Sequence, residues 1–125
     1  MKYVLSFVVA FSFAFTVAAV AQHGHGEKGP NGGPIQDVAG VHAELLTSGN
    51  AITIYVVDES MKGVATEGYT ASALVVRGSE REVVALAPTP PNILKGSAKK
   101  GVGGSAVTVT LKTAAGKTGQ AKFRP

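Results

Sequence analysis

Apolar and polar residues alternate with a period of two along most of the chain after residue 40. Val41, Ala43 and Leu45 show this alternation, and Val107 and Val109 continue it in the C-terminal half. A period of two is typical of strands with one buried face, because successive side chains point to opposite sides of a sheet. The pattern predicts strands at 41–46, 52–57, 70–77, 82–87, 92–97, 105–112 and 120–124.

Turn residues separate these strands. Ser48-Gly49-Asn50 and Gly78-Ser79 each predict a hairpin turn. Pro88, Pro90 and Pro91 are expected to end the 82–87 strand, since proline has no amide proton for a ladder. The segment 92–97 is then expected to form a short edge strand. With no helical periodicity, the fold class is all-β: a small β-sandwich or partly open barrel of about seven short antiparallel strands.

The N-terminus has the composition of a secretory signal. Lys2 is followed by an almost entirely apolar run up to Ala21, which ends in Ala19-Val20-Ala21, a small-x-small cleavage pattern. The alternative is an uncleaved membrane anchor, because the run is nearly long enough to span a bilayer. We expect a signal peptide at 1–21, a periplasmic location, and no membrane association after cleavage.

Glycine and proline dominate the next segment. Residues 22–34 contain five glycines and two prolines, which predicts a flexible His/Gly-rich tail with a turn at Asn31-Gly32-Gly33. Residues 35–125 then form a single β domain. The chain has no cysteine, which excludes disulfides, thiolate ligands and a cysteine nucleophile.

Charge is distributed unevenly. Residues 22–82 hold eight acids and four bases, whereas residues 83–125 hold seven bases and no acid. Basic segments of this kind can bind nucleic acid or anionic membranes. Here the bases lack interleaved aromatics and follow an export signal, so we expect a solvated basic face and no nucleic-acid partner.

All three histidines lie near the start of the exported chain. His23 and His25 are separated by one glycine, and His42 follows on the first predicted strand. Neutral imidazole is the commonest metal ligand in proteins. The two tail histidines therefore have two interpretations, a chelating site for Cu(II) or Ni(II), or a soluble tail without chemistry.

Glu44 lies two residues after His42, so both side chains project from the same face of a strand, about 7 Å apart at their Cα atoms. The alternative is an exposed polar face opposite a core face. Asp58 follows the next strand and could approach His42 across an antiparallel pair, although a turn-capping role fits its position better. Candidate metal ligands are thus His23, His25, His42, Glu44 and Asp58.

Catalysis finds no support in the sequence. The chain has no nucleophile elbow, zincin helix or phosphate-binding loop. We expect a protein that is not an enzyme and has no organic cofactor.

Several short motifs resemble a known group of proteins. Pro30-Asn31-Gly32-Gly33, then His42-Ala43-Glu44-Leu45, then Ile54-Tyr55-Val56-Val57-Asp58 resemble small periplasmic proteins with an Asn-Gly-Gly…His-x-Glu-Leu…Tyr-Val-x-Asp pattern. A similar pattern occurs in an N-terminal domain of periplasmic adaptor proteins of heavy-metal efflux pumps. The resemblance covers residues 29 to about 76. It implies a β-rich domain, a role in copper, zinc or similar metal handling, and an efflux component of the envelope as a partner.

The sequence therefore predicts a periplasmic metal-binding protein for copper, zinc or a similar ion, linked to metal efflux or resistance. The alternative is a metal-free interaction module that docks on an envelope partner through a strand edge, for which the 92–97 strand is the candidate.

Overall fold

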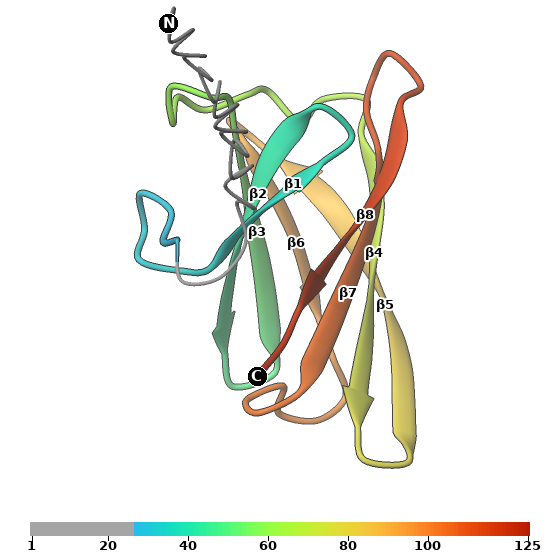
Figure 1. Ribbon diagram of the computed structural model, residues 1–125. Helices are drawn as coiled ribbons and strands as arrows, with labels where there is room; N and C mark the ends of the chain where they lie inside the picture. Colours follow the sequence, from blue (N-terminus) through green and yellow to red (C-terminus); the bar gives the residue numbers. More distant parts are fainter. Residues whose placement is uncertain (1–26) are drawn as a thin grey trace, which may run out of the picture.

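The computed structural model describes residues 27–125, which fold entirely into strands and their connections (Figure 1). In this range no helix is present that could cross a lipid bilayer. The eight strands are β1 Ile35–Val38, β2 Val41–Ser48, β3 Ala51–Val57, β4 Thr70–Arg77, β5 Glu80–Thr89, β6 Ile93–Ser97, β7 Ala106–Lys112 and β8 Thr118–Phe123.

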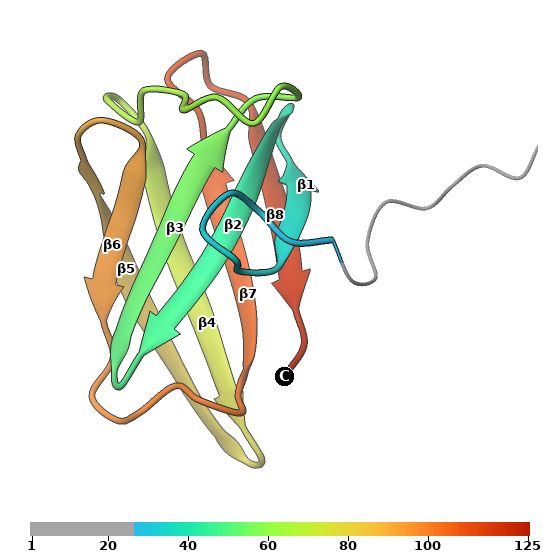
Figure 2. The same cartoon turned by 90° about the vertical axis from the view of Figure 1, so that its left-hand side faces the viewer.

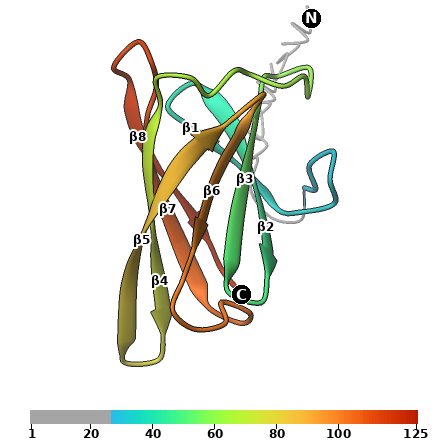
Figure 3. The same cartoon turned by 180° about the vertical axis from the view of Figure 1, so that it is seen from behind.

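All eight strands belong to one antiparallel sheet that curls into a nearly closed barrel. Their order is β1-β2-β3-β6-β5-β4-β7-β8, and β5 passes from one layer to the other by pairing with β4 along its first part and with β6 at its end (Figure 3). The terminal strands β1 and β8 lie beside each other without a hydrogen-bonded ladder (Figure 2). At this seam, a Cβ on Gly119 would lie 2.8 Å from the backbone nitrogen of Ala39.

Small aliphatic side chains from both layers fill the barrel. The alternating residues of β3 and β7 point inward as predicted, and Ile52, Ile54 and Val109 are completely buried. Two aromatic residues, Tyr69 and Phe123, join this core. Burial raises the pKa of the Tyr69 hydroxyl, because a charged phenolate would lose its hydration.

The all-β class is confirmed, with eight strands where about seven were expected. The additional strand is β1, which pairs antiparallel with the start of β2 through the two-residue turn Ala39-Gly40. Both turn residues have positive φ, 50° and 83°, as the tightest hairpin turns require. A strand of four residues is too short to show a clear alternation of apolar and polar residues. The sequence feature that indicates β1 is therefore the Ala39-Gly40 turn.

Two expectations about the proline segment were wrong. Strand β5 does not stop at Pro88 but continues to Thr89, because this part of β5 pairs with β6 and no longer with β4. A strand bonded on one side can hold a residue that lacks an amide proton. The segment predicted as an edge strand at 92–97 is β6, which lies inside the sheet between β3 and β5.

Candidate functional site

A turn that precedes β1 is bonded to a buried carboxylate on β2. The Glu44 side chain accepts hydrogen bonds from the backbone nitrogens of Asn31 and Gly33, at 2.9 and 2.8 Å, and from the Asn31 amide at 3.1 Å. Glu44 is fully buried although it belongs to the outward face of β2, because the Gly29–Gly33 turn packs against its side chain. Figure 2 shows this segment in front of β2. The turn predicted at Asn31–Gly33 is thus present and is held by this residue.

Two positions of this turn, Gly29 and Gly33, have no room for a side chain. A Cβ on Gly29 would overlap the Glu44 carboxyl group, and one on Gly33 would overlap the carbonyl oxygen of Leu45. The backbone of the turn closes on itself through a 2.7 Å bond from the Gly29 nitrogen to the Gly33 oxygen. The Asn-Gly-Gly and His-x-Glu motifs, eleven residues apart in the chain, therefore form one structural unit, the Glu44 latch (Gly29–Gly33 with Glu44).

His42 lies on the same face of β2, directly opposite Asp37 of β1. Its Nδ1 atom contacts the Asp37 carboxylate. The His42 side chain is 23% exposed and that of Asp37 is 62% exposed, so the pair lies at the surface and within reach of solvent. With Nδ1 directed at a carboxylate, the Nε2 atom is the nitrogen available to a ligand.

The His42–Asp37 pair forms one wall of an open hollow of about 440 Å³, the His42 hollow. Glu27 lines it from the N-terminal segment, and Glu59 and Met61 line it from the loop after β3. The wall of the hollow therefore carries an imidazole, three carboxylates and a thioether.

Asp58 shapes the loop that carries Glu59 and Met61. Its Oδ1 atom accepts hydrogen bonds from the backbone nitrogens of Ser60 and Lys62, at 2.8 and 3.0 Å. The Asp58 nitrogen in turn donates to the Lys62 carbonyl at 2.8 Å. Asp58 thus has the turn role that its sequence position favoured.

The candidate ligands do not converge as one set. Glu44 is bonded within the latch, Asp58 is bonded within its turn, and His42 faces the hollow, whereas His23 and His25 lie outside the described residues. Between residues 27 and 125, no three histidine, aspartate, glutamate or cysteine side chains are placed to hold a metal ion together. A site at the His42 hollow therefore needs at least one ligand from elsewhere.

Sequence reasoning missed Asp37, Glu59, Glu27 and Met61 as neighbours of His42. Asp37 could have been found from the Ala39-Gly40 turn, since a two-residue hairpin places residues 37 and 42 opposite each other. The approach of the 58–62 loop depends on the tertiary fold and has no local signal in the sequence.

Comparisons with protein-family models, with characterised proteins and with solved structures found no match to this chain. The functional argument therefore depends on the geometry of the chain itself.

Proposed function

We propose that this protein binds a divalent metal ion, copper or zinc, at the His42 hollow, with His23 and His25 of the tail completing the ligand set. The observation that carries the proposal is the pair of Asp37 and His42 at the wall of a hollow rich in carboxylates. Metal-binding histidines almost always use their second ring nitrogen to bond a carboxylate or carbonyl group, which fixes the ring and increases its basicity.

The first described residue of the tail lies at this hollow. Glu27 lines the hollow, and His25 is two residues away in the chain. Two residues span at most about 7 Å between Cα atoms, so the His25 imidazole can reach the space in front of His42. The tail can thus supply the ligand that the folded part lacks.

The kinds of donor favour copper or zinc over calcium or magnesium. Imidazole suits Zn(II) and Cu(II), and the Met61 thioether is a soft donor that copper accepts, whereas calcium and magnesium prefer oxygen ligands alone. Glu59 offers a carboxylate beside them. Glu44 is not among the ligands we propose, because its oxygen atoms hold the Asn31–Gly33 turn.

Calorimetric titration of the exported protein with Zn(II) and Cu(II) tests the proposal. Mass spectrometry first establishes whether the chain begins at Gln22. We expect one ion per chain, loss of binding in His42→Ala and in the His23→Ala/His25→Ala double variant, and affinity lowered about tenfold in Asp37→Asn.

Glu67→Gln is the matched control for Asp37→Asn, because it also removes one exposed carboxylate but lies away from the His42 hollow. The proposal fails if the parent protein binds neither ion. It also fails if His42→Ala binds as tightly as the parent, or if Asp37→Asn and Glu67→Gln reduce affinity equally.

The resemblance to adaptor domains of heavy-metal efflux pumps suggests where a bound ion would go. We propose an efflux component of the envelope as the partner that receives it. Docking through a strand edge remains the alternative function, and β8 or β1 would have to provide the edge because β6 is paired on both sides.

A further inference from the structure

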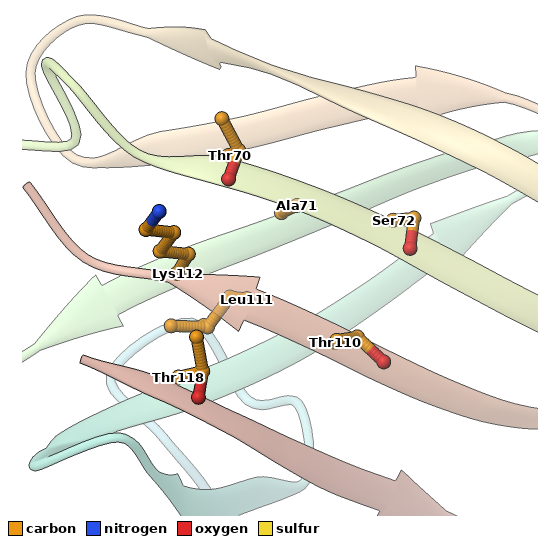
Figure 4. A pocket seen from close by; sticks show the side chains of 7 residues that line it. All are labelled: Thr70, Ala71, Ser72, Thr110, Leu111, Lys112 and Thr118. Carbon is orange, nitrogen blue, oxygen red and sulfur yellow. The ribbon is translucent and has the colours of Figure 1, made fainter. Parts of the chain in front are cut away.

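A second hollow lies on the outside of the other layer, formed by β4, β7 and β8. It has a volume of about 260 Å³, and four hydroxyl-bearing residues and one lysine line its rim: Thr70, Ser72, Thr110, Thr118 and Lys112. Figure 4 shows these side chains on three adjacent strands. The register places Lys112 between Thr70 on one side and Thr118 on the other.

These donors are not used by the fold. Across the described part of the chain, no protein group is bonded to the side-chain hydroxyls of Thr70, Ser72 and Thr118 or to the Lys112 ammonium. Thr110 accepts a hydrogen bond from the Gln120 amide at 3.2 Å, which leaves the proton of its own hydroxyl to donate outward. The rim therefore offers four hydroxyl groups and one positive charge to a ligand.

The electrostatic environment favours an anion. Strands β4, β7 and β8 contain no aspartate or glutamate, whereas Lys112 and Lys122 lie on β7 and β8. The neighbouring strand β5 has two acids, Glu80 and Glu82, at its start. Both pair with Arg77, which lies at the opposite end of β4 from Thr70. No carboxylate on these three strands competes with an acidic ligand for Lys112.

The width of the rim favours an extended ligand. Adjacent strands are about 4.8 Å apart, so Thr70, Lys112 and Thr118 span about 10 Å across three strands. A single phosphate or carboxylate can bond only some of these groups at once. A sugar chain can bond all of them, because its hydroxyl groups repeat along its length and pair with side-chain hydroxyls as donors or acceptors.

We propose that this hollow binds an acidic polysaccharide, a sugar chain that carries carboxylate groups. Lys112 contacts a carboxylate, and the threonine and serine hydroxyls bond the sugar hydroxyls. Phe123 is the one aromatic residue of β4, β7 and β8, and it is buried in the core. Because no ring on this face can stack on a sugar, binding needs the attraction between Lys112 and a carboxylate of the ligand. The proposal is independent of metal binding at the His42 hollow.

NMR titration of the isotope-labelled protein with an oligogalacturonate tests it, beside a neutral maltooligosaccharide and phosphatidylglycerol vesicles. We expect saturable amide shifts from the oligogalacturonate, confined to β4, β7 and β8. Lys112→Gln should weaken binding about fivefold, the effect of one ion pair near water. Thr110→Val should also weaken it, with an unchanged unfolding temperature to show that the sheet is intact.

Lys95→Gln on the outward face of β6 is the matched control, because it removes the same charge from the other layer. It should bind as the parent does. The proposal is overturned by an absence of saturable shifts, by equal binding of the maltooligosaccharide, by binding to vesicles alone, or by equal losses in Lys112→Gln and Lys95→Gln.

Discussion

At the residue scale, Glu44 has a role that its sequence neighbourhood does not reveal. It alternates with core residues and is two residues from His42, as a surface ligand would be. It is nevertheless fully buried, because an N-terminal turn covers it. A buried carboxylate is stable only when hydrogen-bond donors surround it, and here the donors are backbone groups that no sequence pattern places.

Replacing Glu44 by glutamine should destabilise the protein. A glutamine carbonyl oxygen could replace Oε2 and keep the bonds from the Asn31 and Gly33 nitrogens, but the glutamine amide would then face the Asn31 side-chain amide, which is also a donor. We expect the free energy of unfolding to fall by about 2 kcal/mol, measured by urea denaturation. Glu67→Gln, at an exposed position, should leave it unchanged. Equal unfolding free energies for the two variants would show that the Glu44 carboxylate stabilises the turn no more than a glutamine does.

At the scale of elements, alternation located seven of the eight strands, with ends within about two residues of the prediction. The reason is that a barrel with an aliphatic core buries every second residue of a long strand, as in β7. The errors occurred at β1, at Pro88 and at the position of β6. All three features depend on how the strands pair in the sheet. Alternation within one strand carries no information on its neighbours.

The β1–β2 turn offers a direct test at this scale. Ala39 has φ of 50°, a conformation that is strained for alanine and that asparagine tolerates. We expect Ala39→Asn to raise the free energy of unfolding by about 1 kcal/mol. The control is Ala115→Asn in the β7–β8 turn, where φ is not positive. This explanation of the turn would be refuted if the free energy of unfolding rose only in the control, or in neither variant.

At the scale of the whole molecule, the fold separates charges that the sequence shows only as an asymmetry along the chain. The His42 hollow has three carboxylates in its wall, whereas β4, β7 and β8 have none. The uneven distribution could be read from the sequence. The division of these charges between two faces could not be predicted from the sequence, because it depends on the strand order.

The seam between β1 and β8 governs closure of the barrel. A methyl group at Gly119 would press on the Ala39 nitrogen and the Val38 side chain. We expect Gly119→Ala to lower the free energy of unfolding by about 1–3 kcal/mol and to increase self-association in sedimentation experiments, because separated edge strands can pair with other chains. Gly103→Ala, where a methyl group meets no other atom within 4 Å, should do neither. A stable, monomeric Gly119→Ala protein would contradict the close seam.

The Glu44 latch also has a consequence for chemistry in solution. By fixing the backbone at Gly29–Gly33, it leaves His25 only four residues along the chain from a fixed point of the fold. For the metal site that we propose, so short a tether corresponds to an effective concentration in the millimolar range. In that proposed site, donors that would each release an ion quickly act together as a chelate, so weak individual affinities suffice to retain the ion.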